Sequence, residues 1–335
     1  MFTAGFHPLT VKGVVPETAE ASSIVFDIPA DATASFNYVA GQFLTIQLEI
    51  AGQSIVRCYS MSSAPGAAEP FQITVKRVVG GIASNWMLDN LRQGDIVSAR
   101  PPRGQFILGQ EMRPLLMFAG GSGITPIFAL IKSALAKGWP KIRLFYASSS
   151  PESEIFSASL TAIAHQYPSR LEILRHYDSI DGYPTSSALK NFIDDNLDSI
   201  AYLCGPSSFM AAVEGALKAV GVQADRIHAE YFASLTLPET AALAPDGQFV
   251  LECKEGVYGV PYHADESMLS AALALKLPVA FSCAQGHCGA CIVKVLEGDV
   301  RMPPNDLLTE EERNEGLVLL CQARATESNC RVKAI

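Results

Sequence analysis

The feature that most constrains this chain is a group of four cysteines near its carboxyl end. They follow the spacing C-x4-C-x2-C, with the fourth after a long gap: Cys283, Cys288, Cys291 and Cys321. This spacing is typical of plant-type 2Fe-2S ligation, because ferric iron with bridging sulfide favours soft, anionic thiolates. Gly286 and Gly289 suit a loop around a cluster, which needs positive φ angles and backbone N–H groups directed at sulfur. The pattern therefore predicts a 2Fe-2S cluster with these four cysteines as its metal ligands.

Two alternatives to an iron–sulfur cluster stay open. A zinc site with four cysteines usually contains two C-x2-C pairs, and only one is present here. Unrelated buried thiols are the second alternative. Eight cysteines in 335 residues are too few for a disulfide scaffold. We therefore expect Cys253 and Cys330, which lie outside the spacing, to be packed or incidental thiols.

Composition excludes several classes of protein. With 49% hydrophobic and 18% charged residues, the chain is not intrinsically disordered, and its length suggests two or three domains with apolar cores. A formal net charge of -9 argues against a nucleic-acid or anionic-membrane partner. No secretory signal is evident, and glycines interrupt the charge-free stretch 114–131, which favours a strand, a turn and a helix over a membrane span. We therefore expect a soluble, cytoplasmic protein.

Hydrophobic periodicity divides the chain into domains. Residues 44–50 alternate apolar and polar side chains, and turn residues punctuate similar runs, which predicts a small antiparallel β-barrel over 1–111. From 112 to 233, short continuous apolar runs alternate with helical spacing, which predicts a doubly wound α/β domain with a parallel sheet. The remaining segments are a linker and a third domain that carries the cysteine group: 234–246 and 247–335.

Four short segments at expected strand ends could bind phosphates or a flavin, although each could also have an ordinary structural role. They are 57–60, 80–86, 120–126 and 204–206. The second is a glycine turn before a probable helix, whose N–H groups suit a diphosphate, unless Ser84 simply caps that helix. The third lies between a buried strand and a helix, where nucleotide-binding folds place phosphates. Taken alone, the third and fourth could be simple turns.

In this order, the segments and the cysteine group resemble the ferredoxin-NADP reductase superfamily. More narrowly, the chain is similar to members with a plant-type ferredoxin domain at the carboxyl end, such as the reductase components of 3-ketosteroid 9α-hydroxylase and phenylacetyl-CoA epoxidase. The resemblance covers essentially the whole chain. It implies a multidomain fold, with an antiparallel β-barrel flavin domain, an α/β doubly wound nucleotide-binding domain and a β-grasp ferredoxin domain.

The resemblance also implies roles for individual residues. Arg57 would pair with the flavin diphosphate, Tyr59 would lie against the isoalloxazine ring, and Ser60 would bond near its N5. Cys204 would sit beside the nicotinamide ring and Glu230 near the flavin, which makes Tyr59, Ser60, Cys204 and Glu230 the catalytic set. Other residues implied to contact a cofactor are Cys58, Lys76, Gly81, Ile82, Ala83, Ser84, Gly120, Gly121, Ser122, Gly123, Thr125, Gly205, Pro206 and Phe232.

The implied reaction follows from electron counts. A reduced nicotinamide gives up two electrons as hydride and a 2Fe-2S cluster accepts one, so a flavin that can do both must stand between them. The flavin segments resemble those of FAD-binding members more than those of FMN-binding ones. NADH is favoured over NADPH because no arginine follows the apolar run 142–147. Arg175 follows the next run, but Asp178 comes soon after it and would repel a 2′-phosphate.

The resemblance suggests a terminal oxygenase, of the Rieske or di-iron type, as the electron acceptor, and a chain that is monomeric in isolation. Residues 247–335 hold 12 acidic and eight basic residues, so we expect a basic patch on this partner. A reductase of a free ferredoxin, or of another soluble acceptor, is an alternative function. A redox-sensing regulator is a remote one, because no basic surface or DNA-binding helix pair supports it.

Overall fold

The computed structural model describes most of the chain: residues 6–65, 69–194, 198–232, 246–263, 265–281, 284, 286, 289–305, 307–327 and 329–334. The chain forms two compact units, one of residues 1–54 and 59–232 and the other of residues 55–58 and 233–335. The predicted linker 234–246 lies outside the described residues except for Asp246. Among the helices of the described ranges, none is long and apolar enough to cross a bilayer.

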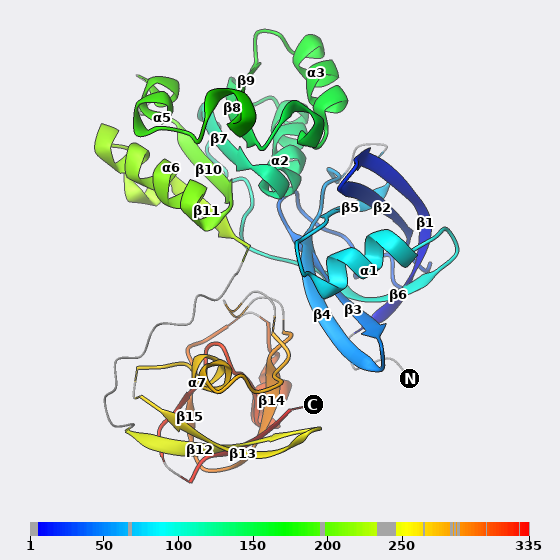
Figure 1. Cartoon of the computed structure of the whole chain (residues 1–335), viewed down its shortest axis with the longest axis vertical. Helices are drawn as coiled ribbons and strands as arrows, with labels where there is room; N and C mark the ends of the chain where they lie inside the picture. The colour runs from blue at the N-terminus through cyan, green and yellow to red at the C-terminus, as the bar shows by residue number, and fades with distance from the viewer. Residues whose placement is uncertain are drawn as a thin grey trace. The chain divides into compact units, whose positions relative to one another are not determined.

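The first domain is an antiparallel β-barrel (Figure 1) with the strand order β4-β3-β6-β1-β2-β5. Its strands are β1 (His7–Thr18), β2 (Ala21–Asp27), β3 (Phe43–Ile50), β4 (Gln53–Ser60), β5 (Phe71–Lys76) and β6 (Ile96–Arg103). A bridge between Met61 and Ile73 joins the chain just after β4 to β5, so the two edge strands of the sheet meet and the barrel closes. Helix α1 (Ile82–Asn90) follows β5.

The second domain is built on a parallel sheet with the order β11-β10-β7-β8-β9. Its strands are β7 (Leu115–Gly120), β8 (Ile142–Ser148), β9 (Leu171–Tyr177), β10 (Ile200–Gly205) and β11 (Ile227–Tyr231). Its longer helices are α2 (Ile124–Ala136), α3 (Ser157–Gln166), α5 (Ser186–Ile193) and α6 (Ser207–Val220), and its short ones are η1 (Gly121–Gly123), η2 (Pro151–Ser153), α4 (Asp178–Asp181) and η3 (Ala224–Arg226). Figure 1 shows α5 and α6 on one side of the sheet and α2 and α3 on the other.

Strand β7 is apolar throughout because both of its faces are covered. Leu115, Met117 and Ala119 belong to a core that includes residues of α2 and α3. Leu116 and Phe118 belong to a second core, with residues of α5 and α6. This is the burial expected of a central parallel strand. The first core also extends into the barrel domain, through Ala21, Ala40 and Phe106.

The order of the parallel strands creates a crevice beside β7. The chain runs from β7 outward to β8 and β9, and then returns to β10 and β11 on the other side of β7. Open α/β sheets bind ligands at such a reversal, outside the carboxyl ends of the two strands concerned. The ends of β7 and β10 are Gly120 and Gly205, so two of the segments predicted to bind cofactors come together here.

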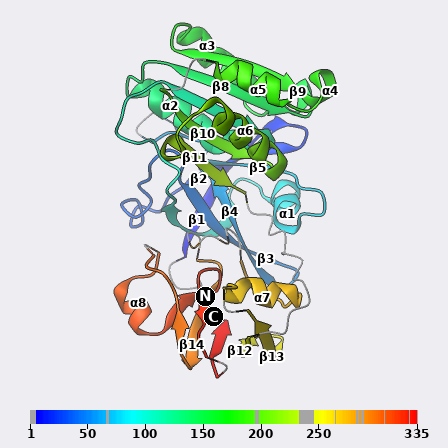
Figure 2. The ribbon, with the colours of Figure 1, turned by 90° about the vertical axis from the view of Figure 1, so that its left-hand side faces the viewer.

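The second unit has a mixed sheet with the order β13-β12-β18-β14-β16, in which β12 and β18 are parallel and the other recorded pairs are antiparallel. The elements are β12 (Gly247–Cys253), β13 (Gly256–Tyr262), α7 (Met268–Ala274), β14 (Ile292–Glu297), β15 (Val300–Arg301), α8 (Glu310–Asn314), β16 (Leu317–Leu319), β17 (Arg324–Ala325) and β18 (Arg331–Ala334). Helix α7 lies against the sheet beside β12 and β13 (Figure 2), which is the β-grasp arrangement.

Candidate functional site

The carboxyl ends of β7 and β10 meet through glycines. A Cβ added to Gly123 would lie 2.1 Å from the backbone oxygen of Cys204, and one added to Gly205 would lie 3.0 Å from the Cα of Gly120. Side chains at these positions would push the two strand ends apart. The glycines therefore let the two strand ends pack closely where helix α2 begins, and they form a cradle in which the N–H groups of the helix start can bind a phosphate. This cradle fits the diphosphate of a dinucleotide.

A side-chain hydrogen bond stabilises the turn after β7, and a cation lies beside this turn. Thr125 donates a hydrogen bond from Oγ1 to the backbone oxygen of Ser122, at 3.0 Å. No side chain caps the helix that starts at Ile124, so N–H groups of its first turn have no side-chain acceptor. The ammonium of Lys76 lies 3.5 Å from where a Cβ on Gly121 would be, and Lys76 has no ion-pair partner within the described ranges. A cation next to bare N–H groups favours an anionic ligand.

Sequence reasoning missed Tyr146, which supports the same turn. Its hydroxyl lies 3.4 Å from the backbone oxygen of Gly121 and 3.3 Å from that of Ile155, and it accepts a hydrogen bond from the Ile155 N–H at 3.1 Å. Tyr146 sits in β8 and is 1% exposed. A lone tyrosine in an apolar strand was the available signal, since a buried tyrosine hydroxyl usually has a partner.

One polar contact joins the barrel to the nucleotide domain at this crevice. Ser60, at the end of β4, donates from Oγ to Oε2 of Glu230 at 3.2 Å. Glu230 is opposite Cys204 in the pairing of β10 with β11, so three of the predicted residues come together. Phe232, two residues further on, is 40% exposed.

Burial changes the protonation of Glu230 and Cys204. Loss of water raises the pKa of Glu230 to about 8, although the hydrogen bond from Ser60 opposes this shift. Near neutral pH this carboxyl can therefore hold a proton or release one. Burial, with the nearby charge of Glu230, raises the pKa of Cys204 well above its usual value. The Cys204 side chain is fully buried within the first core and stays a neutral thiol.

The glycine turn before α1 is not capped by a side chain. The residue at the N-cap position is Gly81, so Ser84 is not the cap that it could have been. Ser84 instead accepts a hydrogen bond at Oγ from the Val78 N–H, at 3.3 Å. A Cβ on Gly81 would lie 2.7 Å from that oxygen, and Gly80 has a φ of 70°. The N–H groups of Ile82 and Ala83 stay without a side-chain cap, which fits a diphosphate at this turn.

Strand β4 presents the other predicted flavin residues. Side chains alternate between the two faces of a strand, so Arg57 and Tyr59 share one face and Cys58 is on the other, while Ser60 ends the strand. Arg57 is exposed and donates to the backbone oxygen of Val56 at 2.8 Å. Tyr59 is half-buried. A guanidinium and an aromatic ring on one face suit the diphosphate and the ring of one flavin.

Two of the four predicted metal ligands are within the described residues. Cys291 and Cys321 are buried, and the Leu320 N–H donates to the backbone oxygen of Cys291 at 3.0 Å, which brings their loops together. The side-chain amide of Gln322 lies 3.7 Å from Sγ of Cys321. Gly286 and Gly289 have φ angles of 84° and 70°. Buried thiols, an N–H donor to sulfur and positive-φ glycines fit a 2Fe-2S cluster. Cys283 and Cys288 lie outside the described residues.

Two of the cysteines outside the spacing, Cys253 and Cys330, lie elsewhere in the same domain. Cys330 is fully buried in its core, and Cys253 is half-buried at the end of β12. Burial raises the pKa of Cys330 to about 11, so this thiol stays protonated at neutral pH. Both environments are those of packed thiols.

Comparison with known families gives three matches along the chain. Residues 9–107 match the oxidoreductase FAD-binding domain, 117–215 the oxidoreductase NAD-binding domain, and 248–326 the 2Fe-2S iron-sulfur cluster binding domain. Each match falls on one of the three folds described above. They confirm the predicted fold class and the expected cofactors FAD, a nicotinamide dinucleotide and a 2Fe-2S cluster.

Relatives match over nearly the whole chain. The ferredoxin reductase component of 3-ketosteroid-9-alpha-monooxygenase from Rhodococcus rhodochrous is 37% identical over 97% of this chain and 96% of its own. One subunit of the 1,2-phenylacetyl-CoA epoxidase from Escherichia coli is 32% identical over 95% and 94%. The fold is also that of phthalate dioxygenase reductase, with a TM-score of 0.64, 24% identity and 98% of both chains covered. The chain belongs to the family of NAD(P)H-dependent flavin and iron–sulfur reductase components of oxygenases.

Proposed function

We propose that this chain takes electrons in pairs from NADH and passes them singly, through FAD and its 2Fe-2S cluster, to a terminal oxygenase. FAD supplies the needed chemistry, because a flavin accepts a hydride and releases electrons one at a time. The observation that carries the proposal is the Ser60–Glu230 contact, where the end of β4 meets β11 beside the carboxyl end of β10. It supports adjacent sites for flavin and nicotinamide, as hydride transfer requires.

On the flavin side, the bare turn of α1 supports binding of the diphosphate by Gly81, Ile82, Ala83 and Ser84, with Arg57 as its cation. Tyr59 would cover the ring, with Cys58 behind it on the other face of β4. Ser60 would donate a hydrogen bond near N5, and Glu230 would hold a proton beside it, since its pKa is about 8. Phe232, exposed after β11, would border the same site.

On the nucleotide side, the glycine cradle supports binding of the dinucleotide. Its members are Gly120, Gly121, Ser122, Gly123, Thr125, Gly205 and Pro206, with Lys76 as the nearby cation. The buried Cys204 would act by shaping the approach of the nicotinamide rather than as a thiolate. The cluster would be held by Cys283, Cys288, Cys291 and Cys321. The domain limits 1–111, 112–233 and 247–335 stay predictions.

The contacts of Arg175 support NADH rather than NADPH. Its Nε donates to Oε1 of Glu154 at 2.8 Å, and a second nitrogen donates to the Thr161 hydroxyl at 2.8 Å. Glu154 is 3% exposed and also accepts a hydrogen bond from Tyr177. The guanidinium near the end of β9 is therefore engaged by a buried carboxylate, and a 2′-phosphate would have to compete with it. Asp178 begins helix α4, and its negative charge would repel a 2′-phosphate.

The names of the relatives support an oxygenase as the electron acceptor, since each is the reductase component or subunit of such a system. We propose a Rieske or di-iron oxygenase, a monomeric chain and a cytoplasmic location. The excess of acidic residues over 247–335 supports a basic docking surface on the partner. The presence of a cluster domain in the chain itself favours this function over a reductase of a free ferredoxin.

The test is made on the purified holoprotein. We expect FAD and about two iron atoms per chain, NADH-dependent reduction of cytochrome c, and a kcat/KM for NADH clearly above that for NADPH. A preference for NADPH would overturn the proposed donor. A protein that binds the cluster but turns over NADH only very slowly would overturn the electron-transfer function.

A further inference from the structure

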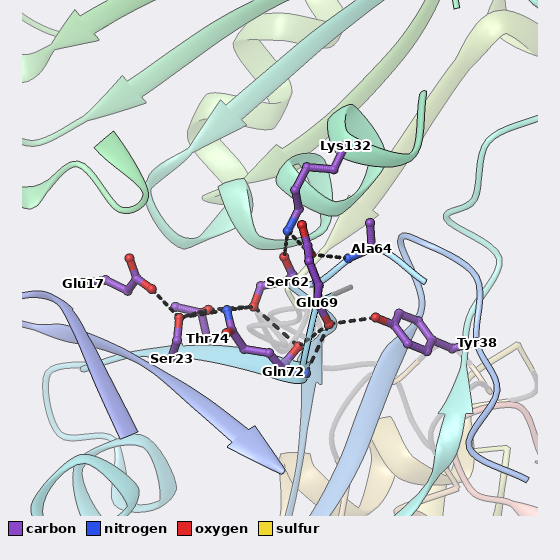
Figure 3. Close-up of polar contacts among 10 residues, drawn as sticks. Glu17, Ser23, Tyr38, Ser62, Ala64, Glu69, Gln72, Thr74 and Lys132 are labelled. Atoms are coloured by element: carbon purple, nitrogen blue, oxygen red, sulfur yellow. Dashed lines mark hydrogen bonds and ion pairs between the residues drawn. The ribbon is translucent and has the colours of Figure 1, made fainter. Parts of the chain in front are cut away.

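Helix α2 of the nucleotide domain shares an apolar core with the barrel, and it also reaches the barrel through one long charged side chain. Lys132 donates from Nζ to the backbone oxygen of Ser62 at 2.9 Å and to Oε2 of Glu69 at 2.6 Å (Figure 3). Both acceptors belong to the barrel domain, in the segment between β4 and β5. The Lys132 side chain is 13% exposed and that of Glu69 is 30% exposed. The contact is thus a largely buried ion pair with a second, neutral acceptor.

The acceptors on the barrel side are held by further hydrogen bonds. Oε2 of Glu69 also accepts from the Ala64 N–H, at 2.9 Å. Ser62 donates its N–H to the backbone oxygen of Gln72 at 2.9 Å, and its hydroxyl shares a 2.8 Å bond with that of Thr74. Figure 3 shows this network continuing from Thr74 to Ser23 and Glu17. The ammonium therefore contacts acceptors that are themselves hydrogen-bonded to other residues of the barrel.

Such an ion pair is a weak way to gain stability. Burial lowers the pKa of Lys132, and only the hydrogen bond and charge of Glu69, with a more distant contribution from Glu17, oppose this. Desolvation of two charges often offsets their attraction, so apolar residues of similar size can be equally stable. The gain from a buried pair is instead geometric, because a short charged contact defines how two surfaces meet.

Both ends of this contact lead to the reaction site. On the nucleotide side, Lys132 is on the helix that starts at the glycine cradle, about 13 Å along its axis from Gly123. On the barrel side, Ser62 is two residues beyond Ser60, which contacts Glu230. The bridge from Met61 to Ile73 holds this segment to β5. The ion pair thus joins the helix that starts at the nucleotide turn to the strand end that carries the predicted flavin contacts.

We propose that Lys132 is a positioning residue for hydride transfer, which fixes the nucleotide domain on the flavin barrel through Ser62 and Glu69. The inference rests on the proposed function and deepens it. Lys132 does not contact either cofactor in this account. Its loss should therefore slow the transfer of hydride within the loaded protein and leave the binding of NADH nearly unchanged.

The test compares Lys132→Met and Glu69→Gln with a matched control, Lys137→Met, in the full-length holoprotein. Lys137 is the exposed C-cap of the same helix. For Lys132→Met we expect the limiting rate of flavin reduction by NADH to fall on the order of 10-fold, with the Kd of NADH changed less than about 2-fold. Glu69→Gln should also lower this limiting rate. The double variant should be no slower than Lys132→Met, because the two substitutions remove the same interaction.

A second readout is independent of turnover. Amide hydrogen exchange over residues 61–65 should be faster in Lys132→Met than in the wild type and in the control, because the partners of Ser62 and Ala64 are loosened. If both Lys132→Met and Glu69→Gln keep the wild-type limiting rate, Lys132 has only a structural role and the inference is wrong, even where the thermal midpoint falls. A wild-type protein whose flavin is not reduced by NADH would instead overturn the proposed function.

Discussion

The two units of this chain encode their sites in different ways. In the cluster domain the predicted ligands form one linear cysteine pattern, and chemistry can be inferred from spacing alone. In the first unit the site consists of common residues that are far apart in sequence, such as Ser60, Gly123 and Glu230, which β4, β7 and β11 bring to one crevice. The difference teaches that spacing reveals a site whose ligands lie mostly in one loop, whereas a site shared by several strands requires the topology.

The largest expected effect separates the two units. Cys291→Ser should remove the cluster and abolish cytochrome c reduction, but ferricyanide should still be reduced, because the proposed flavin and nucleotide residues lie outside the cluster domain. The control is Cys253→Ser, half-buried and outside the spacing, which should keep both activities. Absorbance, iron content and the two activities check this. Loss of both activities in folded Cys291→Ser protein with flavin bound would break the comparison.

The next effect tests how close the strand ends of the first unit lie. Gly123→Ala places a methyl group 2.1 Å from the Cys204 carbonyl oxygen, and overpacking of this kind destabilises by about 1–3 kcal/mol. We also expect a higher KM for NADH. Gly215→Ala is the matched control, since it lies in α6 with nothing within 4 Å, and should stabilise by roughly 0.5–1 kcal/mol. Urea unfolding and NADH kinetics check both variants. If Gly123→Ala were as stable as Gly215→Ala, the close approach of the two strand ends in the cradle would be contradicted.

A smaller effect concerns the exposed rim of the flavin site. Arg57→Ala should weaken FAD binding about 10- to 100-fold, because it removes a charge-assisted contact to the diphosphate. Lys12→Ala, which removes an exposed cation of the same barrel, should leave the affinity unchanged. Fluorescence titration of the flavin-free protein measures both affinities. Equal affinities in the wild type and Arg57→Ala would remove Arg57 from the site.

The last effect is a pH dependence that the cluster domain should not share. Burial raises the pKa of Glu230 from 4.5 to about 8, so the folded state prefers the protonated carboxyl. This preference adds to the free energy of unfolding below the unfolded pKa and is lost as pH rises through about 8. Glutamine does not titrate. The stability of the wild type relative to Glu230→Gln should therefore decrease from about pH 5 to about pH 8 in flavin-free protein. If the free energies of unfolding of the wild type and Glu230→Gln, measured in urea, change with pH in parallel, the burial assigned to Glu230 is contradicted.

The sequence predicts the fold class well and the site unevenly. Periodicity and the apolar run of β7 are local signals, and the structure and family matches confirm the two folds that they indicate, as they confirm the ferredoxin domain that the family resemblance implied. The cap of α1 could not be chosen locally, because Gly81 and Ser84 both suit a helix start. Lys132 and Glu69 carry no signal at all, since the pair joins positions 63 residues apart. Such a contact exists only after the two domains have packed.

The most direct test mixes the holoprotein with NADH without oxygen and follows the absorbance of flavin and cluster with time. We expect flavin absorbance to fall at the rate at which NADH is oxidised and cluster absorbance to change afterwards. In Cys291→Ser protein only the first phase should occur. Two results would contradict the claim that electrons arrive in pairs from NADH at the flavin and leave singly through the cluster. One is reduction of the cluster while the flavin stays oxidised, and the other is purified protein that holds the cluster without a yellow chromophore.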